Sequence, residues 1–158
     1  MKRKSSKSVI LAALLILAVS ALPVQAATLD LGSVEGSSGG SVTLPVTLSG
    51  GNGIAATSVD ISYDAAVLAN PRAEIGKAAK SADKEIHSNT PSKGVFRVGV
   101  LGVNLNEIPD GQVATVTFDV LSSAPSGKII VLSNSPSASD TKGNALTMSG
   151  SNGEVKIK

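Results

Sequence analysis

The chain has 158 residues, of which 42% are hydrophobic and only 2% aromatic, and it contains no cysteine. The lack of cysteine excludes disulfides, thiolate metal sites and cysteine nucleophiles, so packing and strand pairing must supply the stability. Four of the 14 basic residues precede residue 27; the rest of the chain has 10 basic against 12 acidic residues, a net charge of −2, which offers no basic patch for nucleic acid or an anionic membrane.

The first 26 residues have the pattern of a secretory signal peptide. Basic residues precede an apolar run over residues 9–22, and Pro23 is followed by a short segment that suits a signal peptidase. The run of about 14 residues is shorter than the roughly 20 that a spanning helix needs, although an uncleaved anchor is the alternative. We predict cleavage before Ala27 and export, so that the protein is extracellular, on the cell surface or periplasmic.

Alternation of apolar and polar residues predicts β-strands in the remaining chain, which is long enough for one domain over residues 27–158. The clearest alternation lies at residues 41–48, 55–63, 95–101 and 112–121. Shorter strands are expected at residues 28–31, 128–133 and 154–158. Pro45 cannot donate to a strand ladder, so its strand should lie at a sheet edge or turn Pro45 toward an unpaired position.

Residues 64–92 form the least regular part. Residues 72–75 and 85–89 are weak strand candidates, and residues 77–84 form either a loop or one helical turn. A polar loop is expected at residues 134–144. Because turn residues separate many short strands and no segment predicts a long helix, the fold class is expected to be all-β, a sandwich.

The aromatic residues Tyr63, Phe96 and Phe118 fall on the apolar phase of their strands. They are therefore predicted to be buried in the core, where aromatic rings dominate packing. Sugar-binding sandwiches stack exposed rings on sugar faces, so the phase of these residues weakens a carbohydrate-binding interpretation.

The sequence contains no recognisable catalytic constellation. His87 is the only histidine, there is no Gly-x-Ser-x-Gly elbow, and no pair of carboxylates has a setting typical of a glycosidase. We therefore predict that the protein is not an enzyme and needs no cofactor. Asp140 and Asn144 flank a glycine turn that leaves calcium open, but a plain Asx-type turn fits better, because calcium requires about six to eight oxygens.

Several segments, taken in order, resemble one known family. They are Gly-Ser-Val-Thr-Leu-Pro-Val at residues 40–46, residues 54–68 with the ending Tyr-Asp-x-x-Val-Leu, residues 94–101, residues 108–118 beginning Ile-Pro-Asp-Gly, and Asn-Gly-Glu-Val-Lys-Ile at residues 152–157. Their order and spacing resemble the cohesin family, extracellular modules that hold dockerin-bearing enzymes in cellulose-degrading complexes and related surface assemblies. The resemblance implies a jelly-roll β-sandwich of about nine strands that docks a protein and performs no catalysis.

In cohesins, the dockerin lies on a flat sheet face made largely by the third, fifth, sixth and eighth strands. The resemblance assigns this face to residues 55–63, 85–89, 95–101 and 128–133. The outward residues predicted to bind a protein partner are Ala56, Ser58, Asp60, Arg97 and Leu101, with His87 as a further polar candidate. Family members often carry Asn and Asp where this chain has Ala56 and Ser58, which is a departure at positions that recognise the dockerin.

A carbohydrate-binding or purely structural extracellular sandwich is the alternative function. The two classes differ in what they display, because a sugar site needs exposed aromatic rings and a docking face needs a flat surface with a few polar groups. The sequence favours docking, because its three aromatic residues are assigned to the core.

Overall fold

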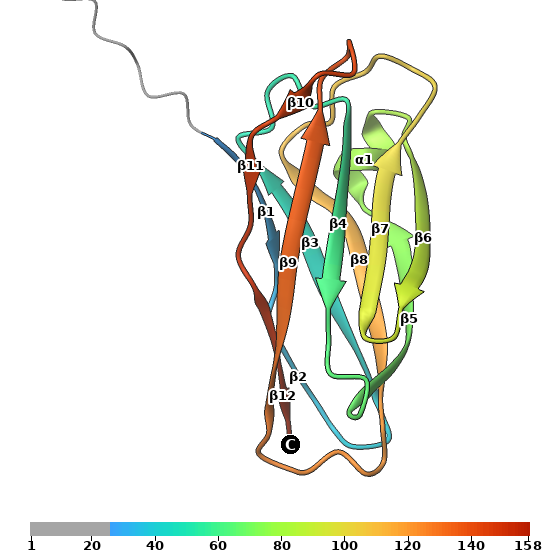
Figure 1. The fold of residues 1–158 in the computed structure, drawn as a ribbon, viewed down its shortest axis with the longest axis vertical. Helices are drawn as coiled ribbons and strands as arrows, with labels where there is room; N and C mark the ends of the chain where they lie inside the picture. Colours follow the sequence, from blue (N-terminus) through green and yellow to red (C-terminus); the bar gives the residue numbers. More distant parts are fainter. Residues whose placement is uncertain (1–25) are drawn as a thin grey trace, which may run out of the picture.

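Two β-sheets pack face to face in the computed structural model, which describes residues 26–158 (Figure 1). The predicted signal peptide of residues 1–26 lies, except for its last residue, outside the described residues. The described part has twelve strands and one short helix, α1 (Lys77–Ser81). It contains no helix that is long and apolar enough to cross a membrane. The predicted all-β sandwich is confirmed.

The first sheet has five strands in the order β11, β1, β3, β8 and β5. Their bounds are β1 (Ala27–Leu31), β3 (Ser41–Ser49), β5 (Leu68–Ile75), β8 (Gly111–Val120) and β11 (Met148–Ser149). β3 and β8 are the central antiparallel pair, with one bulge between Val46 and Thr47. The inward residues of β3 alternate strictly with exposed or half-buried ones, as its sequence predicts.

The second sheet follows the order β2, β12, β9, β4, β7 and β6, with β10 paired to β9. Its strands are β2 (Val34–Gly36), β4 (Ala56–Ser62), β6 (Glu85–Ser92), β7 (Val95–Leu101), β9 (Ile129–Ser139), β10 (Ala145–Leu146) and β12 (Gly153–Ile157). In Figure 1, β9, β4 and β7 stand side by side in front of β3 and β8.

The expected strand number of about nine is too low, because the structure has twelve strands in the residues that it describes. The additional strands are β2, β10 and β11, which contain three, two and two residues. Pairings this short leave no alternation in the sequence, so a pattern with period two cannot reveal them.

β6 continues from its expected end at residue 89 to Ser92, and two other strands extend further beyond their predicted bounds. β9 continues to Ser139, so the first half of the expected polar loop at residues 134–144 is a strand. β5 begins at Leu68 and continues past Pro71 through an irregularity between Ala69 and Arg72. Polar and turn-forming residues hid both extensions, because the pairing with neighbouring strands overrides local preference.

The core lies between the two sheets and is closed by α1 (Figure 1). Phe118 is completely buried and Phe96 is 2% exposed, as predicted for both. Tyr63 is only partly buried, which corrects the prediction, because it lies just after β4 ends. Its ring still packs on the core, with a centroid distance of 5.0 Å to the Phe118 ring.

Pro45 lies inside β3, and β3 is not an edge strand. The second alternative for Pro45, an unpaired position, is the one that the structure adopts. Its carbonyl accepts a hydrogen bond from the Gly32 N–H at 2.9 Å, just beyond the end of β1, so the proline nitrogen faces a side where the neighbouring strand has ended. A Cβ on Gly32 would approach the proline ring to 2.7 Å, which explains the glycine there.

Candidate protein-docking face

The strands β9, β4, β7 and β6 form one continuous outer face of the second sheet, as the resemblance implied for the four corresponding segments. Strand register aligns their outward side chains in three rows. The rows are Ser139–Ala56–Leu101–Glu85, Ser137–Ser58–Gly99–His87 and Ser135–Asp60–Arg97–Asn89. We call this surface the docking face. It contains all five residues that the sequence analysis selected.

Asp60 and Arg97 make a bidentate ion pair across β4 and β7. The Arg97 Nε donates to Oδ1 of Asp60 at 2.6 Å, and Nη2 donates to Oδ2 at 2.7 Å. The hydrogen bond from Arg97 lowers the pKa of Asp60 below its ordinary value, and Asp60 in turn raises the pKa of Arg97. Both groups stay charged at neutral pH. About half of the Arg97 side chain remains exposed, so it can still contact a partner.

The middle row is built from small side chains. Ser58 and Ser137 share a hydrogen bond between their hydroxyl groups at 2.8 Å. Beneath them, the buried Thr57 hydroxyl donates to the Ser137 carbonyl at 2.9 Å, which fixes β9 against β4. The centre of the docking face is consequently flat, with hydroxyl groups that are already bonded to each other.

Gly99 lies in the same row, between Ser58 and His87. A Cβ there would lie 3.5 Å from Cδ2 of Leu101 and 3.8 Å from the His87 carbonyl oxygen, which is ordinary van der Waals contact. The fold itself therefore does not require glycine at this position. A glycine inside a strand weakens the strand and often marks the close approach of another molecule.

Leu101 separates two shallow hollows on the docking face. One hollow, of about 340 Å³, lies on the Gly99 side and is bordered by Arg97 and His87. The other, of about 360 Å³, lies on the side of Ala56 and Ser139. Leu101 and Ser58 line both hollows, and Leu101 is 45% exposed. The face thus offers an apolar projection between two depressions, which suits side chains of an opposing surface.

The sequence analysis missed Ser135 and Ser137 as members of the face. The serines fell in the segment assigned to a loop, although Ser occurs at every second position from 133 to 139, a signal that could have identified an outward strand phase. His87 lies on the face as expected and is largely exposed, with its Nε2 3.6 Å from Oε2 of Glu85.

Residues 140–144 form the predicted Asx-type turn. Oδ1 of Asp140 accepts hydrogen bonds from the backbone N–H groups of Lys142 and Asn144, both at 2.8 Å. Oδ2 accepts a third bond from the Asn144 side chain at 2.9 Å, the contact that contributes most to lowering the pKa of Asp140. Its carboxylate oxygens are thus engaged in holding the turn.

Residues 27–157 match the family model of the cohesin domain. The chain belongs to the cohesin family. This family is a protein-binding module and not an enzyme family. Its members are typically components of extracellular cellulosome assemblies. No curated protein sequence matches this cohesin.

Solved cohesin structures have the same fold. The sixth cohesin of scaffoldin B from Acetivibrio cellulolyticus, in complex with a mutant Cel5 dockerin, is 28% identical with a TM-score of 0.74, and the match covers 84% of this chain and 99% of that one. A type I cohesin–dockerin complex from Clostridium thermocellum has 20% identity, the same two coverages and a TM-score of 0.73.

A non-cellulosomal cohesin from the archaeon Archaeoglobus fulgidus is also similar. It is 20% identical, the TM-score is 0.70, and the match covers 84% of this chain and 91% of that one. The fold is therefore shared between proteins with and without a cellulosomal description.

Proposed function

We propose that this cohesin is a non-catalytic docking module that binds a dockerin-like protein through the docking face. The observation that carries the proposal is the geometry of that face in a member of the cohesin family. Ala56, Ser58, Asp60, Arg97 and Leu101 lie together on neighbouring strands, on a flat surface with two hollows. Two of the similar structures are complexes of a cohesin with a dockerin, which supports a dockerin-bearing partner.

The residues have distinct parts in the proposed interface. Leu101 and the flat row of Ser58, Ser137 and Gly99 form the central contact, where loss of water contributes most of the binding energy. A standard interface would bury about 800 Å² on this side. The Asp60–Arg97 pair is half exposed, and exposed charges of this kind act mainly on partner choice and association rate.

The small residues Ala56 and Ser58 define the specificity of the proposed interface. They leave room where family members often carry the larger Asn and Asp. A partner that fills this room needs larger side chains at the matching positions than a standard dockerin has. We therefore propose that this cohesin prefers a dockerin-like module with a modified recognition segment.

We also propose that residues 1–26 direct export and are removed, and that residues 27–158 form the single functional domain. The basic start and the short apolar run support this proposal. The intact mass of protein recovered from its host tests it. A protein that still carries residues 1–26 would contradict it.

Carbohydrate binding receives no support from the aromatic residues. Phe96 and Phe118 are buried, and Tyr63 packs its ring against Phe118. None of these three residues offers an exposed flat ring on which a sugar could stack. The competing function is therefore a purely structural sandwich, which the binding experiment separates from docking.

Substitution at the centre of the docking face tests the proposed function. Purified module is titrated with a panel of dockerin modules, and Ser58→Arg should abolish the binding that the wild type shows, because a long charged side chain lifts the partner off the flat row. Thr115→Arg is the matched control, since Thr115 lies half buried on the opposite sheet beside Glu74. Unchanged binding by Ser58→Arg would show that the partner uses another surface. A wild type that binds no dockerin would favour a structural role.

A further inference from the structure

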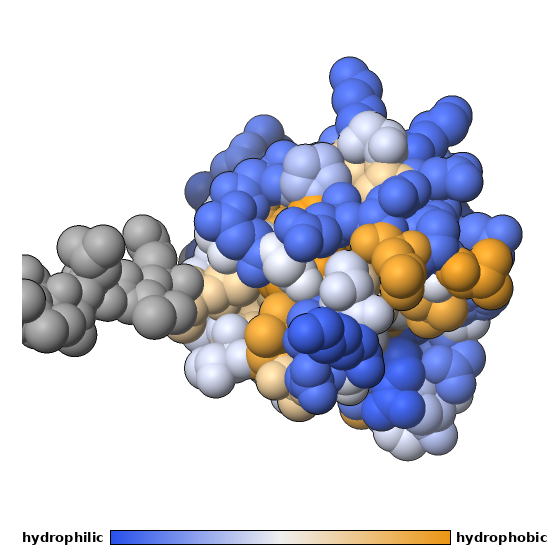
Figure 2. Space-filling model, turned by 90° about the horizontal axis from the view of Figure 1, so that it is seen from above, coloured by the Kyte–Doolittle hydropathy of each residue, from blue (hydrophilic) through white to orange (hydrophobic). Residues whose placement is uncertain are grey.

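Three large apolar side chains are exposed at one end of the sandwich. In the part of the chain that the structure describes, Leu101 is 45%, Val103 111% and Leu105 71% exposed. Figure 1 shows the loop that follows β7 rising above the strands, and Figure 2, which looks onto that end, shows hydrophobic side chains at the surface. We call these three residues the apolar ridge.

Hydrogen bonds from the intervening asparagines hold the apolar ridge outward. The Asn104 side chain donates to the Asp83 carbonyl at 2.6 Å, and the Asn106 side chain donates to the Ala82 carbonyl at 3.2 Å. Oδ1 of Asn104 also accepts from the Asn106 N–H at 3.0 Å. Since Asn104 and Asn106 face the body of the protein, their neighbours Val103 and Leu105 are turned toward solvent.

Lys84 completes this arrangement from below the loop. It is only 5% exposed, and its Nζ donates to Oδ1 of Asn104 at 2.8 Å and to the Asn104 carbonyl at 3.2 Å. Burial lowers the pKa of Lys84, because a charged ammonium group loses hydration there. Gly102 packs tightly against the same cluster, since a Cβ there would lie 3.3 Å from Asn104, Asp83 and Lys84 atoms. The loop is therefore fixed by many contacts, and the exposure of its apolar residues is part of the fold.

A partner that covers the apolar ridge gains the free energy of burying it. Exposed apolar residues that cluster at one place commonly mark an interaction site. The ridge is continuous with the docking face, because Leu101 ends β7, borders both hollows of that face and is also the first residue of the ridge. A single protein bound across β4 and β7 would therefore reach Val103 and Leu105 by extending past the end of β7.

We propose that the apolar ridge is a second contact for the same dockerin-like partner, and that it receives an apolar segment at the end of the partner that overhangs β7. This inference rests on the proposed function. It adds Val103 and Leu105 as residues that determine which partner is bound, because only a partner with apolar side chains at this end gains from the ridge. Loop residues fixed in advance bind without an ordering cost, which favours affinity.

The test removes the apolar character of the ridge while keeping its loop. The double variant Val103→Ser with Leu105→Ser is titrated calorimetrically with the panel dockerin that the wild type binds best. Binding should weaken by about tenfold or more, since two apolar side chains lose their burial. The matched control, Val103→Ile with Leu105→Met, keeps apolar side chains at both positions and should bind within about twofold of the wild type.

Thermal unfolding of the serine variant should match that of the wild type, because both residues are already exposed. If the serine variant binds within about twofold of the wild type, the ridge does not contact the partner, and the proposed function is unaffected. A wild type that binds none of the dockerins overturns both. Sedimentation of the module alone gives a further outcome: self-association that the serine variant loses would show that a second copy covers the ridge, which also overturns the proposal.

Discussion

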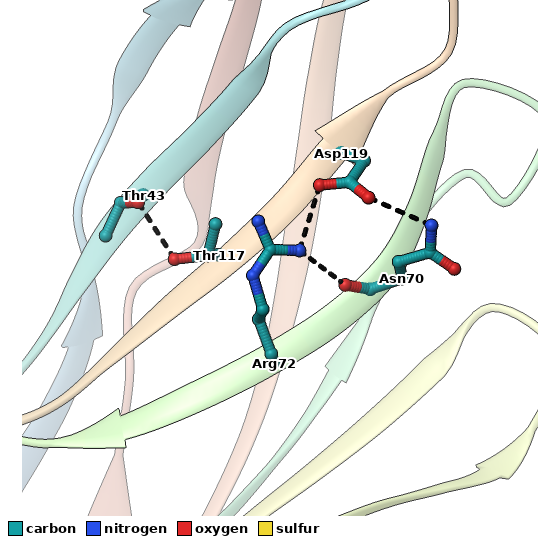
Figure 3. A network of polar contacts seen from close by, with 5 residues as sticks. All are labelled: Thr43, Asn70, Arg72, Thr117 and Asp119. Carbon is teal, nitrogen blue, oxygen red and sulfur yellow. Dashed lines mark hydrogen bonds and ion pairs between the residues drawn. The ribbon is translucent and has the colours of Figure 1, made fainter.

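The outer face of β3, β8 and β5 and the docking face lie on opposite sides of the same core. On the first of these, the Thr43 and Thr117 hydroxyls are hydrogen bonded to each other at 2.8 Å (Figure 3). Beside them, Asp119 accepts from both Asn70 and Arg72 at 2.9 Å, and Arg72 also donates to the Asn70 carbonyl at 3.2 Å. These side chains fill the surface and use their polar atoms on each other.

The docking face uses smaller residues in the same type of strand. Its centre carries Ala56, Ser58 and Gly99, whereas the outer face of the first sheet carries the larger Thr43, Thr117 and Arg72. Threonine favours strands and glycine disfavours them, so the docking face gives up some local stability. In return, it keeps hollows on both sides of Leu101. This difference supports the proposal that the second sheet contacts another molecule through its outer face.

The substitution with the largest expected effect removes a core residue on which both sheets pack. Phe118 is completely buried and contacts the rings of Tyr63 and Phe96, which belong to the docking-face side of the core. Phe118→Ala should lower the free energy of unfolding by roughly 3–5 kcal/mol, because it removes packing and leaves a cavity between the sheets. A urea titration measures this loss, and a change near zero would contradict the burial of the ring.

A substitution in β7 should reduce binding at the docking face without lowering the stability of the fold. Gly99→Val fills the hollow between Leu101 and His87, so we expect dockerin binding to weaken by about 100-fold. The stability should be unchanged or higher, because a Cβ fits at ordinary contact distances and valine favours strands. Calorimetric titration and thermal unfolding measure the two effects.

Thr117→Val is the matched control for Gly99→Val. It removes the hydroxyl contact to Thr43 on the opposite face and keeps the size of the side chain. Binding should stay at the wild-type level. The comparison of the two faces fails if both variants lose binding equally, or if Gly99→Val unfolds the module.

Much of this asymmetry could be predicted from the sequence. The alternation in β4 is strict, and β7 departs from it only at Gly99, which is buried between Val98 and Val100. The outward phase of Ser58, Asp60 and Arg97 therefore follows from period-two counting. The period-two spacing of the serines gives the phase of Ser137 but not the existence of its strand, because Asn134 and Pro136 are typical of loops and the segment becomes a strand by pairing with β4. The importance of Gly99 depends on the space around it, which a sequence does not contain.

The apolar ridge shows a second limit of sequence interpretation. Val103 and Leu105 alternate with Gly102, Asn104 and Asn106, a pattern that equally suits a short strand with an apolar inner face. The burial of Lys84 beneath the loop decides the orientation, and Lys84 lies 20 residues from Asn104 in sequence. Contacts of this kind are set by the tertiary fold, so the exposure of the ridge could not be predicted locally.

The smallest expected effects come from the ion pairs, one on each face. Asp60 pairs with Arg97 and Asp119 with Arg72. The hydrogen bond from Arg97 lowers the pKa of Asp60 below the ordinary 3.8, and the hydrogen bonds from Asn70 and then Arg72 do the same for Asp119. A carboxyl whose pKa is lowered in the folded state stabilises the fold above its unfolded pKa and loses that contribution as pH falls through the folded pKa. Both pairs are about half exposed, so solvent screening keeps each contribution small.

Asp60→Asn and Asp119→Asn should therefore each lower the midpoint of thermal unfolding slightly at pH 7. The difference from the wild type should persist down to about pH 5 and vanish as the pH falls well below 4, when the wild-type carboxyl groups become protonated. Only Asp60→Asn should alter the association rate with a dockerin at low ionic strength, since it leaves the positive charge of Arg97 unpaired on the docking face. Stopped-flow association and thermal unfolding as a function of pH distinguish the pairs. Equal effects of the two variants on association would show that the charge of the whole module, and not the docking face, sets the encounter rate.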